Sequence, residues 1–347
     1  MSLAELTDRE RRVLAAVIQS YVESAEPAGS RALSRRFDLG VSPATIRNTM
    51  SDLEEKGFLF HPHTSAGRIP TDRAYRAYVE SLTEVAPPLG AESRRLVAEL
   101  SGGDNAIEAI LRRAAQTLGV LTQELGVALG PRLDQTMLER LELMRISTDR
   151  LILVLTLGGG LARTIFVDVP SEIADHAVTA VQQVLNERLA GLTLRDIRNT
   201  LAARLRDTLA VGNAAELLNI FIEEGEQMFD VPLGGAADGV VLGQASLLAD
   251  QPEFSSGDGM RRVIELTETR NLLAEVLRNR AHGPGLSITI GNEHGDPLLE
   301  RFTMVTAEYH SGSISGVIGV IGPTRMPYDK VISLVTHTSQ LVSDLLH

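Results

Sequence analysis

The sequence predicts a multidomain α+β protein whose N-terminal part is a winged helix-turn-helix. Within residues 29–76, two short helical patterns are followed by a proline-bounded hairpin pattern and then by another helical pattern. Farther along, strand patterns lie on both sides of a long helical block. The length of 347 residues allows two or three domains, each with its own core. Strands interrupted by a helical block indicate one α+β domain that carries an insertion.

The first two helices are indicated by a capping signal and by apolar spacing. Thr7 and Glu10 have the spacing of a capping box, in which a hydroxyl and a carboxylate satisfy free amides at a helix start. One helical stripe then holds Val13, Leu14, Val17, Ile18, Tyr21 and Val22. A second helix is expected to start near Ser30 and to place Leu33 and Phe37 against the same core.

The third helix is the expected DNA-reading element. Ser42 is a suitable N-cap and Pro43 a suitable first helical residue, while Gly57 is placed to end the helix. The core face is expected to hold Ile46, Met50 and Leu53. The residues expected on the opposite, outward side of the helix, as candidate readers of DNA, are Ala44, Thr45, Arg47, Asn48 and Ser51. In helix-turn-helix docking the N-terminal part of the second helix enters the major groove, where arginine pairs with guanine and asparagine with adenine.

A hairpin after the third helix is expected to form the wing. Residues 58–60 have the pattern of a short strand, and residues 61–70 contain two prolines and a Ser-Ala-Gly turn. The candidate contacts at the hairpin tip are His63, Ser65 and Arg68. Such a tip can lie on backbone phosphate or reach the minor groove, where arginine is favoured. Thr71 is expected to cap a fourth helix.

Charge is distributed unevenly along the chain. The net charge is −12, yet residues 1–80 hold eleven basic and eleven acidic residues, so the deficit lies in residues 81–347. The basic groups expected on the DNA-facing side are Arg31, Arg35, Arg36, Arg47, Arg68, Arg73 and Arg76. Since the rest of the chain repels a duplex at long range, we expect weak non-specific binding and a need for dimerisation.

Four separated runs resemble the HrcA family of heat-inducible transcription repressors. They are GSR at residues 29–31, SPATIRN at 42–48, PHTSAGRIPT at 62–71 and GVIGPTRM at 319–326. The runs occur in the family's order, and the resemblance spans nearly the whole chain. It implies DNA contacts by the runs' own residues, namely Arg31, Ser42, Thr45, Arg47, Asn48, His63, Ser65 and Arg68.

The resemblance also implies an architecture and partners. It implies a winged helix-turn-helix over residues 1–86, linker helices and the first part of a GAF-like domain over 91–170, an inserted helical dimerisation domain over 171–230, and the second part of the GAF-like domain over 231–347. A homodimer would bind the CIRCE inverted repeat upstream of chaperone operons. The GroEL chaperonin would maintain the active form, which heat shock depletes.

Two features of the central region leave alternatives open. After the expected linker at residues 87–90, a heptad-like seam is formed by Ile107, Leu111, Ala114, Leu118, Leu121 and Leu125. This seam can pair with a second copy or pack on its own domain, and the spacing favours neither. The GAF-like domain can likewise serve a chaperonin-dependent repressor or sense a small molecule in a cavity.

Several function classes are excluded by missing residue types and motifs. The chain has no cysteine, no metal-ligand cluster is evident, and the triple glycine at 158–160 lacks the Gly-Lys-Ser/Thr of a phosphate loop. No nucleophile elbow lies between a strand and a helix, so we expect no enzymatic activity and no cofactor. Without a leader or an apolar run of membrane-spanning length, the protein is expected to be soluble and cytoplasmic, with no membrane partner.

Overall fold

The structure is a computed structural model that divides the chain into two compact units. It describes residues 6–62, 67–82, 88, 90–102, 107–131, 136–158, 161–169, 173–206, 213–229, 239–280, 285–311 and 314–346. Unit 1 comprises residues 1–129, 240–309 and 317–345, and unit 2 comprises residues 130–239, 310–316 and 346–347. Both units contain helices and antiparallel sheets, so the predicted α+β class is confirmed.

Unit 1 begins with a small helical segment, which we call the head (described residues 6–82). Its elements are α1 (Asp8–Ser24), α2 (Ser30–Arg36), α3 (Pro43–Glu55), β1 (Leu59–Phe60), β2 (Ile69–Pro70) and α4 (Asp72–Ser81). The predicted N-caps are confirmed: Thr7 closes a capping box with Glu10, Ser42 caps α3 and Thr71 caps α4. The head core contains Val13, Leu14, Val17, Ile18, Leu33, Ile46, Met50 and Leu53.

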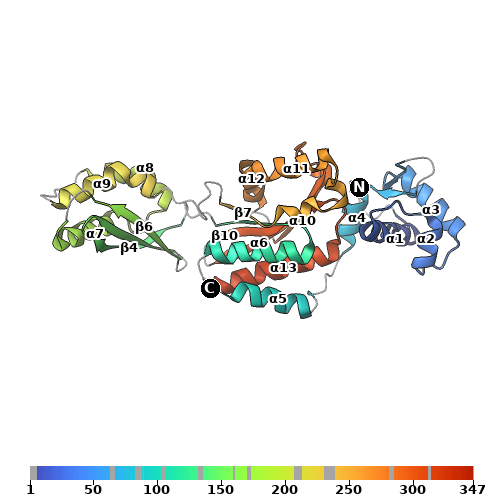
Figure 1. The fold of residues 1–347 in the computed structure, drawn as a ribbon, viewed down its shortest axis with the longest axis horizontal. Coiled ribbons are helices and arrows are strands. Elements are labelled where there is room, and N and C mark those ends of the chain that lie inside the picture. The colour runs from blue at the N-terminus through green and yellow to red at the C-terminus, as the bar shows by residue number, and fades with distance from the viewer. Residues whose placement is uncertain are drawn as a thin grey trace. The chain divides into compact units, whose positions relative to one another are not determined.

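The rest of unit 1, which we call the body, is a five-stranded sheet with helices on both faces (Figure 1). The strand order is β7 (Val240–Leu242), β3 (Leu125–Leu129), β10 (Ile314–Pro323), β9 (Phe302–Ser311) and β8 (Leu286–Ile290). One face is covered by α5 (Gly90–Ser101), α6 (Ile107–Thr122) and α13 (Tyr328–Leu345). The other is covered by α10 (Ala245–Ala249), α11 (Gly257–Glu268) and α12 (Arg270–Arg280), with the short turns η4 (Pro252–Phe254) and η5 (Gly291–His294) nearby.

The heptad-like seam packs on its own domain. Ile107, Leu111, Ala114 and Leu118 are at most 9% exposed within this single chain, and α6 contacts β3 and α13. Leu125 starts strand β3 instead of continuing the helix. Of the two alternatives that the spacing left open, intramolecular packing is the one observed.

The described residues of unit 2 form a three-stranded antiparallel sheet and three helices. The sheet has the order β4 (Leu138–Ser147), β5 (Arg150–Leu157) and β6 (Leu161–Asp168), and the helices are α7 (Asp175–Leu189), α8 (Leu194–Leu205) and α9 (Asn213–Met228). Side chains of α7 bond the β4 backbone: Asn186 accepts from the Leu141 amide at 2.9 Å and donates to its carbonyl at 2.7 Å. This satisfies backbone groups at a sheet edge, which would otherwise be open to pairing.

The expected division of the chain differs from the observed one in this region. Residues 138–168, which form β4–β6, were expected within the GAF-like part at residues 91–170, whereas the structure groups residues 130–239 as one unit. The reason is burial: Leu151, Leu153 and Leu155 on alternate positions of β5 are completely buried, and an apolar sheet face of this kind needs a helical layer of its own. In both units, no helix among the described residues is long and apolar enough to span a membrane.

Candidate nucleic-acid interface

Helix α3 presents polar side chains because its opposite face is anchored in the head core. The anchors are Ile46, Met50 and Leu53, each at most 1% exposed. At the N-terminus, the Ser42 hydroxyl accepts from the Thr45 amide at 3.2 Å and lies 3.0 Å from the Thr45 hydroxyl. Arg47 and Asn48, one turn into the helix, are exposed, as the spacing predicted. The first turn and a half of α3 therefore offers hydroxyl, guanidinium and amide groups from a rigid helix.

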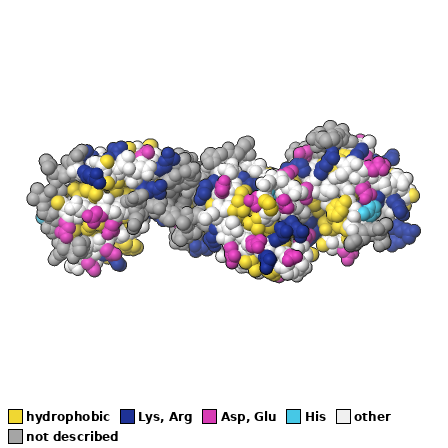
Figure 2. Space-filling view, turned by 90° about the horizontal axis from the view of Figure 1, so that it is seen from above, with side chains coloured by type: hydrophobic (Ala, Val, Ile, Leu, Met, Phe, Trp, Pro, Cys, Tyr) yellow, Lys and Arg dark blue, Asp and Glu magenta, His cyan; other side chains and the backbone are white. Residues whose placement is uncertain are grey.

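Helix α2 adds basic side chains next to α3. Arg31, Arg35 and Arg36 are all exposed, and the two helices contact each other. Arg36 pairs with Glu23 on α1, whereas the side chains of Arg31 and Arg47 form no hydrogen bond or ion pair with another described residue. Figure 2 shows lysine and arginine side chains gathered at the end of unit 1 where Figure 1 places α2 and α3.

The hairpin β1–β2 is tied to the head at its base. Leu59 pairs with Pro70 and Phe60 with Ile69. Next to β2, Arg68 exchanges backbone hydrogen bonds with Ala28, which precedes α2, at 2.9 and 3.0 Å. The predicted tip residues His63 and Ser65 lie outside the described residues.

Arg68 lies at the hairpin base and not at an exposed tip. It is 8% exposed, donates from Nη2 to the Ser51 hydroxyl at 2.8 Å and from Nε to Glu54 Oε2 at 3.1 Å. The expectation that its side chain is free for phosphate is therefore wrong for the described conformation. The hydrogen bond from Arg68 also occupies the hydroxyl of Ser51, an expected DNA-reading residue on α3. The Ala28–Arg68 pairing that turns Arg68 inward joins residues 40 positions apart, which local spacing does not reveal.

Glu54 receives two basic partners in this arrangement. His61 Nδ1 lies 2.7 Å from Glu54 Oε1, and Arg68 bonds the other oxygen. The hydrogen bond with His61, followed by that from Arg68, lowers the pKa of Glu54 below its ordinary value even though partial burial opposes this. The hairpin is thus held to α3 by a small polar cluster.

Two further arginines of the expected basic face are also engaged within the chain. The Arg73 guanidinium lies 4.4 Å from the centre of the Phe58 ring and donates to the Lys56 carbonyl at 2.7 Å. Arg76 pairs with Glu293 of the body. The basic groups with the freest access to a duplex therefore lie on α2 and α3.

Replacing Arg68 by alanine is expected to destabilise the head without removing a phosphate contact. The Arg68→Ala variant loses the bonds to Ser51 and Glu54, and the expected loss is about 1–2 kcal/mol of unfolding free energy, reduced from the buried-pair range because Glu54 is partly exposed. Urea denaturation measures the loss, and the salt dependence of DNA affinity should stay unchanged. Arg31→Ala is the matched control, with unchanged stability and a shallower salt dependence. An Arg68→Ala variant that behaved like Arg31→Ala would show that Arg68 contacts phosphate.

The comparisons with known proteins identify the family. The family model described as the HrcA protein C-terminal domain matches residues 108–332. A heat-inducible transcription repressor HrcA of Chlorobium phaeobacteroides strain BS1 is 37% identical over 359 residues, covering 100% of both chains. The chain belongs to the HrcA family. An HrcA repressor of Chlorobium limicola is 36% identical and covers 100% of this chain and 99% of its own.

A solved structure shares the fold of this HrcA-family chain. It is a crystal structure of a hypothetical protein at 2.2 Å resolution, with a TM-score of 0.70, 21% identity and coverage of 98% of each chain. At this identity the likeness concerns the fold alone. The family itself consists of transcription repressors, so the HrcA resemblance is confirmed, and with it the expectation that the chain is a transcription regulator and not an enzyme.

Proposed function

We propose that this HrcA-family chain represses class I heat-shock chaperone genes by binding the CIRCE inverted repeat as a homodimer. The observation that carries the proposal is the N-terminal part of α3, where exposed Arg47 and Asn48 are held outward by a helix face that is completely buried. Rigid support of this kind is what base readout requires, because each side chain has to meet a base edge at fixed geometry. Relatives along the full length are named heat-inducible repressors, which supports the same conclusion.

In this proposal the head is a winged helix-turn-helix. Helices α2 and α3 are the two helices of the motif, and α3 enters the major groove. The β1–β2 hairpin is the wing, and His63 and Ser65, which the sequence predicts at its tip, contact phosphate or the minor groove. Arg31 on α2 and the Ser42 and Thr45 hydroxyls at the start of α3 contact the backbone beside the groove. Arg68 contributes by holding the wing against α3.

We assign dimerisation to the open sheet face of unit 2. The register places Met144, Ile152 and Phe166 in one row across β4, β5 and β6. Met144 is 49% exposed and Phe166 is 63% exposed, and Ile146 beside them is 51% exposed. Exposed apolar side chains gathered on one sheet face mark an interaction surface. A second copy meeting this face around a two-fold axis would match the symmetry of an inverted repeat. The body would then be the GAF-like domain and unit 2 its dimerising insertion.

The charge distribution makes two-site binding necessary. The first 80 residues have no net charge, and residues 81–347 carry the whole net charge of −12. A single head therefore attracts phosphate only through the local groups on α2 and α3. When two heads are joined in a dimer, binding of the first head to DNA makes binding of the second head intramolecular. The dimer therefore binds an inverted repeat much more tightly than one head binds a half-site.

Chaperonin control follows as a population effect. Operator affinity scales with the fraction of dimer that is folded and competent to bind. GroEL raises this fraction, and heat-damaged proteins that occupy GroEL lower it, so a modest loss of folded repressor gives derepression. This part of the proposal rests on the family resemblance.

Replacing Arg47 by alanine is expected to weaken and relax operator recognition. If Arg47 binds a guanine in two hydrogen bonds, Arg47→Ala costs roughly 1–3 kcal/mol per half-site, and discrimination at one base pair in each half-site disappears. Fluorescence anisotropy on the repeat and on single-base variants measures both effects. Arg95→Ala, which removes an exposed arginine from α5 of the body, is the control. If the variant lost the same affinity for every DNA sequence, Arg47 would be a phosphate contact and not a base contact.

A further inference from the structure

The head and the body of unit 1 are joined by polar side chains. On the head side, Arg76 of α4 donates from Nε to Glu293 Oε1 at 2.7 Å and from Nη2 to the Ile288 carbonyl at 2.8 Å. Asp72, one turn earlier, accepts from the backbone and side-chain amides of Asn292, both at 3.1 Å. These contacts attach the start of α4 to strand β8 and turn η5.

Arg325 makes the corresponding link from the body to the other end of the head. It follows the end of β10, as the last residue of the GPTR run at 322–325, and its side chain is 10% exposed. It donates from Nη1 to the carbonyl of Val22 near the end of α1 at 2.6 Å, and binds Glu253 through Nε at 2.6 Å and Nη2 at 3.1 Å. Burial lowers the pKa of Arg325, but the bonds to Glu253 outweigh burial and raise it above its ordinary value. The guanidinium is therefore charged and fixed in direction.

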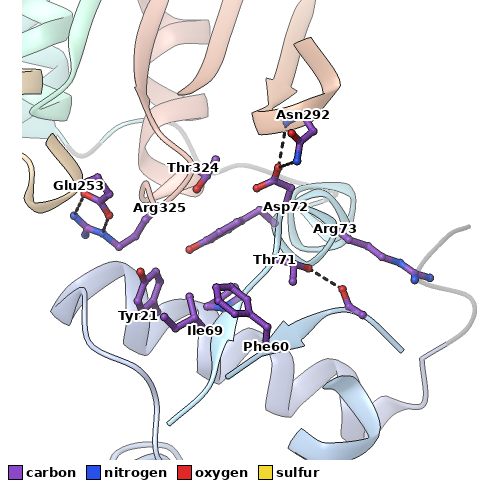
Figure 3. A pocket seen from close by; sticks show the side chains of 13 residues that line it. Tyr21, Phe60, Ile69, Thr71, Asp72, Arg73, Glu253, Asn292, Thr324 and Arg325 are labelled. Atoms are coloured by element: carbon purple, nitrogen blue, oxygen red, sulfur yellow. Dashed lines mark hydrogen bonds and ion pairs between the residues drawn. The ribbon is translucent and has the colours of Figure 1, made fainter. Parts of the chain in front are cut away.

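A cavity lies between these links. The cavity has a volume of about 540 Å³ and is lined by residues of both parts, among them Tyr21, Phe60, Thr71 and Thr324. Figure 3 shows Arg325 directed at Glu253 on one side and Asp72 directed at Asn292 on the other. The head and body also meet in an aromatic contact, with the buried Tyr75 and Tyr328 rings 5.8 Å apart. The orientation of the head thus depends on a few directed bonds.

Gly291 shows how closely the two parts meet. Its φ is +53°, and a Cβ built there would lie 2.1 Å from Asp72 Oδ2. A side chain at this position would displace the carboxylate that holds Asn292. The contact between Asp72 of the head and turn η5 of the body therefore requires glycine at position 291.

We propose that Arg325 and Arg76 are positioning residues that set the half-site spacing read by the dimer. The inference rests on the proposed function and extends it to the body. Half-sites of an inverted repeat have a fixed separation and helical phase. Heads held rigidly on the bodies of a dimer match one spacing, whereas heads held only by the chain connection tolerate several spacings at lower effective concentration. Neither arginine contacts DNA in this scheme, because the reading groups lie on α2 and α3.

The test compares the full-length protein and its Arg325→Gln variant on three duplexes by fluorescence anisotropy. The duplexes are the CIRCE repeat, the same repeat with about five base pairs added between half-sites, and a single half-site; five base pairs rotate one half-site by half a turn. The unchanged protein is expected to lose roughly 100-fold in affinity on the lengthened repeat. Arg325→Gln is expected to lose less than roughly fivefold there, with its half-site affinity unchanged. Lys330→Gln, which breaks an ion pair with Glu92 inside the body, should behave like the unchanged protein.

A second variant and a distance measurement guard against misfolding. Arg76→Gln removes the link at the other end of the joint and should relax spacing in the same way. Because the chain has no cysteine, spin labels can be attached at Gln19→Cys in the head and Glu268→Cys in the body. The distribution of distances between the two labels should become broader in both glutamine variants. Unchanged discrimination and unchanged label distances would overturn the inference. A protein that shows no preference for the repeat over the half-site would instead contradict the proposed function itself.

Discussion

Replacing Phe166 by glutamate is expected to turn the dimer into a monomer. Phe166 is 63% exposed on β6 and pairs with Ile152 of β5, which in turn pairs with Met144 of β4. In a dimer built on this face, Phe166→Glu buries two unpaired carboxylates close to the two-fold axis, and each costs several kcal/mol unless the interface opens. The expected result is a monomer with at least roughly 100-fold weaker operator binding, because both heads no longer bind as one unit.

Sedimentation velocity and anisotropy on the same samples check this expectation. Since Phe166 is largely exposed in the single chain, the fold of the monomer should survive, and circular dichroism tests this. Ile264→Glu is the matched control, because Ile264 is 48% exposed on α11 of the body and lies outside the sheet of unit 2. A Phe166→Glu protein that remains dimeric and keeps its operator affinity would rule out the proposed dimer face.

Replacing Met50 by aspartate is expected to abolish DNA binding by unfolding the head. Met50 is 1% exposed on the buried face of α3, between Ile46 and Leu53. A carboxylate there has no cationic partner within the packed face, and burying it costs several kcal/mol, comparable with the whole stability of a small domain. Hydrogen exchange should show loss of protection in α1–α4 while the body and unit 2 stay protected.

The conservative change at the same position separates packing from DNA contact. Met50→Leu preserves volume and apolar character and should cost less than about 1.5 kcal/mol. Operator affinity should then be close to that of the unchanged protein. If Met50→Asp remained folded and still bound the operator, the orientation of α3, and with it the choice of Arg47 and Asn48, would be wrong.

Local rules predicted the head well because its signals are local. The caps at Thr7, Ser42 and Thr71 each depend on residues three positions apart, and all three are present. The buried face of α3 follows from helical spacing alone. Arg68 was misplaced because its inward direction depends on pairing with Ala28, a long-range contact.

The rest of the chain shows the same limit. Strands on both sides of a helical block were predicted and are present, whereas strand β4 and the helices α10–α12 were not predicted. The limits of unit 2 depend on which layer covers the apolar face of β5, and this is settled by tertiary packing. The role of Arg325 likewise had no local signal: the GPTR run reads as a tight turn, and only the fold brings it to Val22 and Glu253.

The most direct test of the central claim is fluorescence anisotropy of the full-length protein on a CIRCE repeat and on a duplex with one half-site scrambled. The measurement is made at one salt concentration, before and after mild heating, with and without GroEL and ATP. We expect strong preference for the intact repeat, loss of binding on heating, and recovery with GroEL. If GroEL and ATP did not restore the preference after heating, the proposed role of the chaperonin would be wrong. Equal affinity for the two duplexes would contradict the claim that this chain is a dimeric operator-binding repressor.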